Sequence, residues 1–218
     1  MNPGQLIFFF LFGLLLVAVV QVGALSLAFD KLGLSQHSAM LLLISSFVGS
    51  LINLPLFTIR AEASQPQPIP PWLKGMLGGR LPPFEGKTVI AVNLGGCLLP
   101  LGFSIYLIQF SQLPLATVAL ACLVTTAIGY AFSRPLPGLG IGMPVFVAPL
   151  AAALVAIWLA PENSPALAYI SGTVGVLVGA DLLRLKDIRR MGTPIASIGG
   201  AGTFDGIFIT GIVAVLLA

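Results

Sequence analysis

The chain has 218 residues, of which 57% are hydrophobic and 8% are charged, and its formal net charge is +3 at pH 7. Soluble globular domains carry about 25% charged residues, so this composition, with a mean hydropathy of +1.06, excludes a soluble enzyme. A bilayer crossing takes about 20 apolar residues, which leaves room for roughly seven crossings and no sizeable domain in water. We therefore predict an all-α, polytopic membrane protein made of one transmembrane domain.

Apolar segments bounded by charge, proline or glycine predict the transmembrane helices in chain order. They lie near residues 6–29, 38–59, 88–110, 114–133, 144–160, 165–183 and 195–217. The first of them is apolar on every face from residue 6 to residue 20, which is the pattern of a helix surrounded by apolar material. The expected fold is a bundle of about seven transmembrane helices.

The basic residues predict the orientation of this bundle. With seven crossings, nine of the ten Lys and Arg residues fall on one side of the membrane, and only Lys31 falls on the other. Basic loops stay in the cytoplasm, so we expect a multi-pass protein of the inner (plasma) membrane with a cytoplasmic N-terminus and an outside C-terminus. The cytoplasmic loop at 60–87 contains six prolines, and it is predicted to be a semi-rigid linker or a segment resting on lipid headgroups.

Two of the seven acidic residues lie inside predicted spans and are the candidate catalytic residues. Asp181 is near the cytoplasmic end of the sixth span, and Asp205 is within the seventh. A carboxylate at membrane depth costs at least ~2.5 kcal/mol on insertion scales, so such residues are functional candidates. Two carboxylates that meet in a low dielectric share a proton, an arrangement that can activate a water molecule.

Glycines are expected to support this site. Gly202 and Gly206 share a helical face with Asp205, where small residues let two helices approach closely. Three more glycines alternate in the connection RPLPGLGIGMP at 134–144, and they are Gly138, Gly140 and Gly142. This connection either dips back into the membrane beside the aspartates or forms a tight, ordered link.

At these residues the chain resembles a known family. An aspartate late in an inward-running helix, a cytoplasmic connection and a Gly-rich lead into GTFDGIF resemble the catalytic helices of the GxGD, or presenilin-like, intramembrane aspartyl proteases. The resemblance covers residues 170–215, with Gly202 as the first motif glycine and Phe204 in place of the second. It implies that Asp181 and Asp205 hydrolyse a transmembrane peptide. The whole chain also resembles an uncharacterised prokaryotic family of multi-pass membrane proteins, a domain of unknown function.

Two other functions stay open. The same aspartates suit a proton- or cation-linked transporter or channel-like protein. They also suit a non-catalytic scaffold in which Asp181 pairs with Arg184 and Asp205 donates a hydrogen bond to the backbone. We expect membrane lipids as partners and no nucleic acid, and the sequence does not predict the oligomeric state.

The remaining polar residues in the apolar spans give weaker signals. Asn93, in the third span, and Asn53, in the second, mark places where helices unwind at a substrate site or where an amide bonds to a neighbouring helix. The only histidine, His37, has no second ligand nearby, and both cysteines, Cys97 and Cys122, lie in apolar spans. We therefore predict no metal site and no cofactor.

Overall fold

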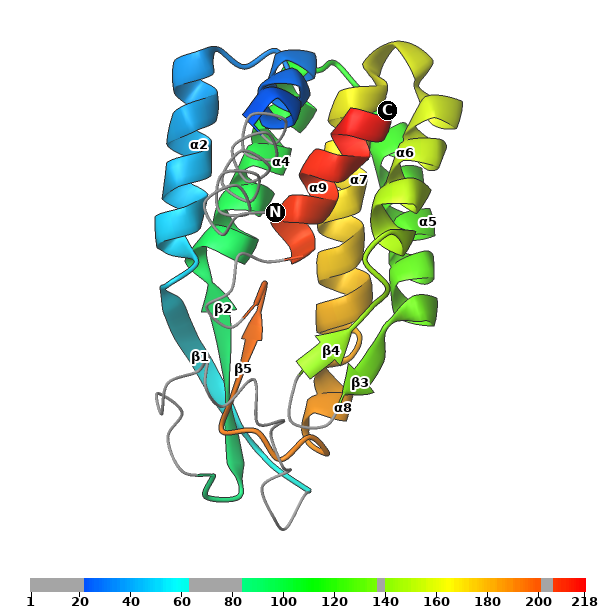
Figure 1. The fold of residues 1–218 in the computed structure, drawn as a ribbon. Coiled ribbons are helices and arrows are strands. Elements are labelled where there is room, and N and C mark those ends of the chain that lie inside the picture. The colour runs from blue at the N-terminus through cyan, green and yellow to red at the C-terminus, as the bar shows by residue number, and fades with distance from the viewer. Residues whose placement is uncertain (1–21, 63–83, 137–139, 201–205) are drawn as a thin grey trace, which may run out of the picture.

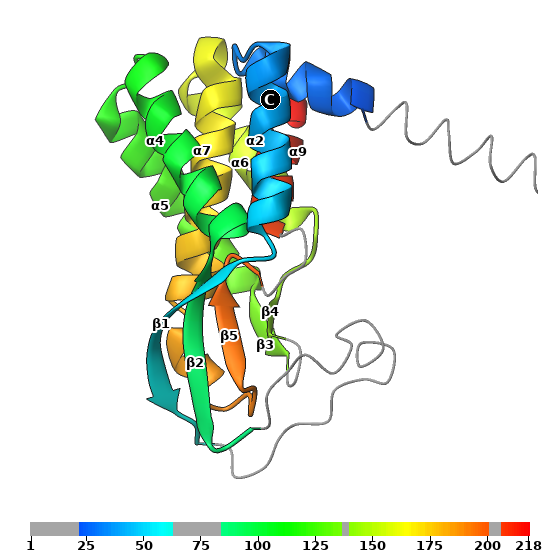
Figure 2. The same ribbon diagram turned by 90° about the vertical axis from the view of Figure 1, so that its left-hand side faces the viewer.

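The computed structural model describes residues 22–62, 84–136, 140–200 and 206–218. Helices gather at one end of the molecule and short strands at the other (Figure 1). A view turned by 90° shows the strands extending from the helical end along the direction of the helix axes (Figure 2). The molecule therefore has a helical end and a strand end.

Most of the described residues are helical. In chain order the helices are α2 (Gln36–Gly49), α4 (Leu99–Phe110), α5 (Leu115–Phe132), α6 (Val147–Leu159), α7 (Ser164–Val176), α8 (Leu185–Ile188) and α9 (Gly206–Leu217). Two π-helical segments extend this set: η1 (Leu94–Leu98) leads into α4, and η3 (Leu177–Leu182) continues α7. A 3-10 turn, η2 (Pro161–Asn163), precedes α7. A further helical stretch, Val22–Lys31, is bent by 114° from α2.

The strand end contains two small sheets. The larger has the order β1-β2-β5 and consists of β1 (Asn53–Arg60), β2 (Lys87–Asn93) and β5 (Ile195–Ile198). β1 pairs with β2 in antiparallel fashion, and β2 pairs with β5 in parallel. The smaller sheet is an antiparallel pair of β3 (Arg134–Leu136) and β4 (Gly140–Gly142).

The strands correct the all-α prediction, because three of the predicted spans are only partly helical. The second predicted span, 38–59, ends as β1, the third, 88–110, begins as β2, and the seventh, 195–217, begins as β5. Pro55 lacks an N–H and would break a helix, and it lies beside a β-bulge of the edge strand β1, where proline is tolerated. β2 reads KTVIAVN, and its β-branched residues favour a strand.

The described helices of sufficient length and apolarity to cross a membrane are α5 and the continuous helix Pro161–Leu182. They coincide with the predicted spans 114–133 and 165–183. The bent pair Val22–Lys31 and Gln36–Gly49 makes a third if it counts as one span, and Leu94–Phe110 and Val147–Leu159 are shorter apolar helices. Most of the first predicted span, 6–29, and of the loop 60–87 lies outside the described residues.

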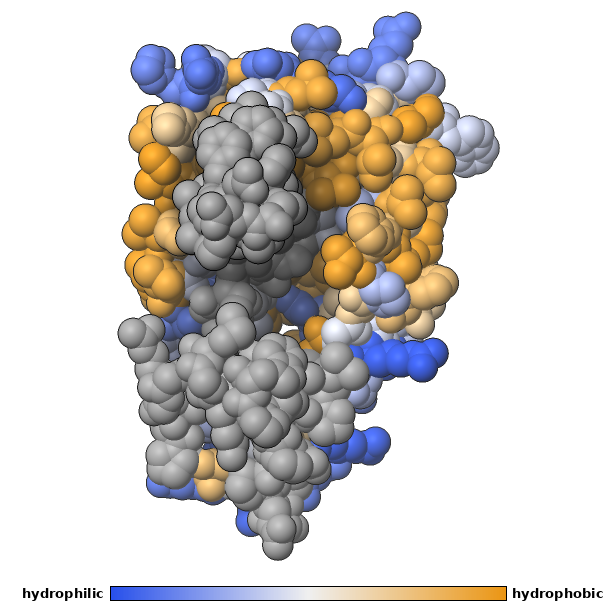
Figure 3. Space-filling view, viewed as in Figure 1, coloured by the Kyte–Doolittle hydropathy of each residue, from blue (hydrophilic) through white to orange (hydrophobic). Residues whose placement is uncertain are grey.

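The core of the helical end is built around α7. Tyr169 on α7 is fully buried, and its ring meets that of Phe103 on α4 edge-on, with 5.0 Å between the ring centres. The outward faces are apolar, as Trp158 shows with 82% of its surface exposed. The apolar residues form a band between hydrophilic residues at the two ends (Figure 3). Exposed apolar surface of this extent is typical of a lipid-facing belt.

Candidate functional site

Asp181 lies where the helical end meets the strand end. It belongs to η3, the π-helical continuation of α7, and it is half-buried. Its Oδ2 atom accepts a hydrogen bond of 2.9 Å from the backbone N–H of Gly199, just after β5. A bond from an N–H orients the carboxylate. Asp181 therefore connects η3 to the segment that leads from β5 into α9.

The backbone at Gly199 requires glycine. Its φ of +82° lies in the left-handed region, and a Cβ atom there would be 2.6 Å from the Cβ of Cys97. Gly200 follows with φ +92°. A side chain at residue 199 would push this segment away from η1. Without one, the segment packs closely on η1, and the Gly199 N–H reaches Asp181.

A buried amide network holds the top of the larger sheet. Asn93 is fully buried, and its Nδ2 donates to the Ser50 carbonyl at 2.7 Å and to Asn53 Oδ1 at 3.0 Å. Its Oδ1 accepts from the Gly96 N–H at 2.7 Å and caps η1. Asn53 Oδ1 also accepts from the Ser197 hydroxyl on β5. The two asparagines therefore meet and connect β1, β2 and β5, rather than bonding one membrane helix to another.

The start of α9 shares a buried cluster with η3. Ile207, in the first turn of α9, is 2% exposed and belongs to the buried cluster that contains Leu177 and Ala180 of η3 and Ile198 of β5. Gly206 begins α9. Asp205 and Gly202 lie outside the described residues. Ile207 of α9 and the segment that carries Asp181 therefore share one buried cluster.

The glycine-rich connection forms a hairpin. Gly142 pairs with Arg134, and Gly140 pairs with Leu136, in the β3–β4 ladder. Gly138 lies outside the described residues. Ile141 packs against the buried cluster that contains Ala180. The described parts of this connection therefore pair with each other, and the β4 strand contacts η3.

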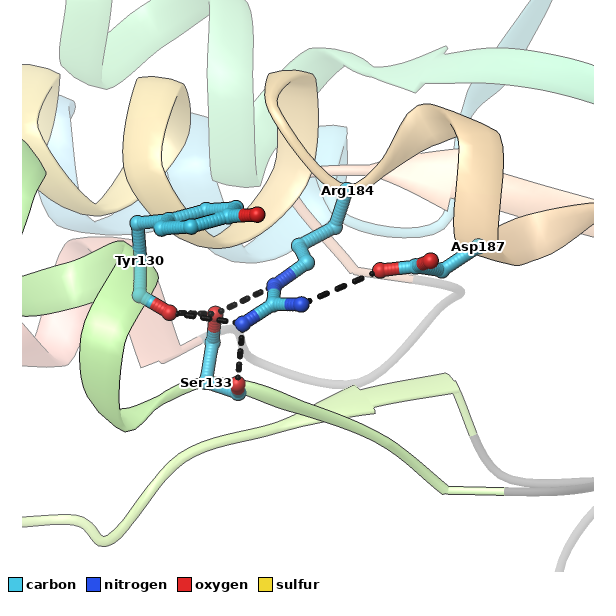
Figure 4. Close-up of polar contacts among 4 residues, drawn as sticks. All are labelled: Tyr130, Ser133, Arg184 and Asp187. Carbon is cyan, nitrogen blue, oxygen red and sulfur yellow. Dashed lines mark hydrogen bonds and ion pairs between the residues drawn. The ribbon is translucent and has the colours of Figure 1, made fainter.

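Arg184 binds the end of α5 (Figure 4). Its guanidinium donates to the carbonyls of Tyr130 at 2.8 Å and Ser133 at 2.9 Å, and it lies 4.1 Å from the centre of the Tyr130 ring. Its ion pair, at 3.2 Å, is with Asp187. Arg184 therefore satisfies carbonyls that the end of a helix leaves without partners.

We expect Arg184→Gln to lower the free energy of unfolding by about 2 kcal/mol, because charged hydrogen bonds to partly buried carbonyls are lost. Arg190→Gln is the matched control, since Arg190 pairs with Glu62 in a bridge whose side chains are 78% and 56% exposed. Exposed pairs contribute little, so the control should change stability by less than about 0.5 kcal/mol. Unfolding in a detergent titration measures both, and equal losses would contradict the capping role.

Among residues 22–62, 84–136, 140–200 and 206–218, no group of three or more His, Cys, Asp or Glu side chains is arranged to hold a metal ion. Cys97 is buried and Cys122 is half-buried. The described polar groups at the junction are instead a carboxylate, amides, a hydroxyl and backbone N–H groups. Their chemistry is that of hydrogen bonding and proton transfer.

Sequence reasoning missed both π-helical segments and the position of β5 beside β2. The available signal for η3 was GVLVG, in which Gly175 and Gly179 are four residues apart and mark close contact with another helix. The signal for the sheet was the β-branched content of 87–93, which the continuous apolar pattern concealed.

The fold and this junction define a class of protein: a mostly helical membrane-type protein with a small mixed sheet beneath the bundle and a half-buried aspartate between the two. The chain belongs to the family described as "Protein of unknown function (DUF1614)", whose model matches residues 47–217. That range includes all five strands and the helices from α4 to α9. No curated protein and no solved structure matches the chain.

Proposed function

We propose that this chain is an intramembrane aspartyl protease in which Asp181 and Asp205 act together on a peptide bond of a transmembrane substrate. The observation that carries the proposal is the Asp181–Gly199 hydrogen bond, which ties the carboxylate to the segment leading into α9. The buried contact of Ile207 with the cluster around η3 supports the same arrangement. Asp205 directly precedes α9 in the sequence, and in this proposal it meets Asp181.

The proposed reaction needs one water and no cofactor. Asp181, as the charged partner, takes a proton from water while the oxygen attacks the peptide carbonyl. Asp205, as the protonated partner, donates its proton to the carbonyl oxygen. Asp181 then passes the proton that it took from water to the leaving amine, the C–N bond breaks, and Asp205 recovers a proton from the diol hydroxyl as the new carboxyl group forms. The hydrogen bond from Gly199 orients the Asp181 carboxylate for this step.

The proposed setting is the inner (plasma) membrane, with the helical end in lipid and the strand end in the cytoplasm. Arg60 and Lys87 lie at the strand end, where β1 stops and β2 starts. Lys31 lies at the other end, where its Nζ donates to the Val215 carbonyl near the end of α9. This charge distribution supports an outside C-terminus. The seven predicted crossings are retained in this proposal.

A photoreactive peptide analogue with a hydroxyethylene group in place of the scissile bond tests this proposal without knowledge of the substrate. Such a hydroxyl resembles the tetrahedral intermediate and binds between paired carboxyls. We expect labelling of the full chain in lipid nanodiscs, and a loss on the order of 100-fold in Asp181→Asn and in Asp205→Asn. Asp30→Asn, the same chemical change at the exposed opposite end, should label like the parent.

Equal labelling of the parent and both aspartate variants would exclude a catalytic pair. Proteoliposomes with a pH-sensitive dye inside separate the transporter alternative. Proton flux that requires Asp181 and Asp205, in a chain that the analogue does not label, would replace the protease with proton-linked transport. Cleavage of a transmembrane peptide pool, detected by mass spectrometry and absent in both variants, would confirm the protease.

A further inference from the structure

A groove lies at the level where the apolar surface of the molecule stops. On one side, exposed apolar residues continue from Phe47 and Val48 of α2 down to Phe57 of β1, before Arg60. On the other side, Leu182 and Leu183 are exposed just before the first basic residue of the α8 region. Along the chain on both sides of the groove, exposed apolar residues therefore give way to basic ones, as expected at a membrane surface.

The groove lies between the larger sheet and α8 and has a volume of about 140 Å³. Its lining combines apolar and basic side chains, and consists of Phe57, Ile59, Ile90, Leu185, Lys186 and Arg189. Ile90 is fully buried and forms the floor, whereas Phe57 is 50% exposed. The volume corresponds to roughly five water molecules, which is suitable for a phosphate group together with the first atoms attached to it.

The charge in the groove is not neutralised by the ion pairs that the structure describes. Arg184 pairs with Asp187, and Arg190 pairs with Glu62. Among the described residues, Lys186 and Arg189 are in neither of these pairs, and both are exposed. Two cations beside an apolar wall favour a ligand that is anionic at one end and apolar at the other.

We propose that this groove binds one anionic phospholipid of the cytoplasmic leaflet. Lys186 and Arg189 hold the phosphate, and an acyl chain lies against Phe57 and the apolar face of β1 and α2 above it. Anionic lipids are concentrated in the cytoplasmic leaflet and attract basic residues near the surface. A soluble phosphate would use the two cations but would leave the apolar wall uncovered.

Native mass spectrometry of the full chain in mild detergent tests the site. The probe is an equimolar mixture of phosphatidylglycerol and phosphatidylcholine with the same acyl chains. We expect the parent to retain phosphatidylglycerol preferentially, and the double variant Lys186→Gln/Arg189→Gln to lower the ratio of the two bound lipids by about tenfold. An unchanged melting temperature shows that the variant is folded.

Arg60→Gln/Lys87→Gln is the matched control, because it removes two charges at the tip of the β1–β2 hairpin, outside this groove. The control should leave the lipid ratio close to that of the parent. Equal loss in both double variants would show general charge attraction and overturn the site, as would a parent without lipid preference. Glycerol phosphate should not displace the bound lipid, and displacement by it would assign the groove to a soluble phosphate instead.

Discussion

Gly179→Ala should lower the free energy of unfolding by about 3 kcal/mol, because it inserts a methyl group where η3 touches the backbone of α5. A Cβ atom at Gly179 would be 2.9 Å from the Tyr130 nitrogen and in closer conflict with the Thr126 carbonyl oxygen. Backbone atoms cannot rotate away as a side chain can, so α5 and η3 must separate. The measurement is the unfolding free energy in a detergent titration.

Gly102→Ala is the control for this substitution. Gly102 lies within α4, and a Cβ atom there would meet nothing within 4 Å. Alanine stabilises a helix relative to glycine by roughly 0.5–1 kcal/mol, so the control should be neutral or slightly more stable. If both variants lose the same stability, the close approach of α5 and η3 is not what requires glycine at 179.

Asn93→Ala should be destabilising by about 3 kcal/mol, because it leaves the Ser50 carbonyl and the Gly96 N–H without their buried partner. The same change removes the donor to Asn53, which also binds Ser197 of β5. Because Gly199 follows β5 directly, we expect faster amide hydrogen exchange at residues 195–199 as well. Detergent unfolding and hydrogen exchange with mass spectrometry measure the two effects.

Asn163→Ala makes the identical change at an exposed position before α7, where the side chain makes no capping hydrogen bond. It should alter stability by less than about 0.5 kcal/mol and leave hydrogen exchange in β5 unchanged. An Asn93 variant as stable as this control would mean that the amide network does not hold the sheet. Loss of stability without faster exchange in β5 would separate Asn93 from the site around Asp181.

The sequence predicted the helices whose apolar runs lack competing signals. The run from 114 to 133 contains no proline after Pro114, and α5 occupies it almost completely. The prediction of a single helix from 38 to 59 was wrong, because Asn53 and Pro55 interrupt the apolar run. An apolar segment that faces lipid and one that pairs in a buried sheet have the same composition, so periodicity alone could not separate them.

The candidate site was predicted in part. The sequence indicated Asp181 because placing a carboxylate in an apolar helix costs free energy. In the structure Asp181 lies where the helical end meets the strand end. The sequence alternative in which Asp181 pairs with Arg184 differs from the observed ion pair, since Arg184 binds Asp187 and caps α5. Asp181 and Asp187 both lie three residues from Arg184, so spacing alone allows either ion pair. The position of α5, whose carbonyls bind the guanidinium, decides that Arg184 pairs with Asp187.

The sequence by itself determined three things. They are the apolar composition, the excess of basic residues on one side of the predicted membrane, and the two aspartates inside apolar segments. These properties belong to single residues and short windows, so no tertiary contact is needed to read them. The tertiary structure alone decided that β5 lies beside β2, that Gly199 contacts Asp181, and that Lys186 and Arg189 face Phe57 across a groove. Each of these joins residues far apart in the chain, and such contacts depend on how the helices pack through buried glycines rather than on any local pattern.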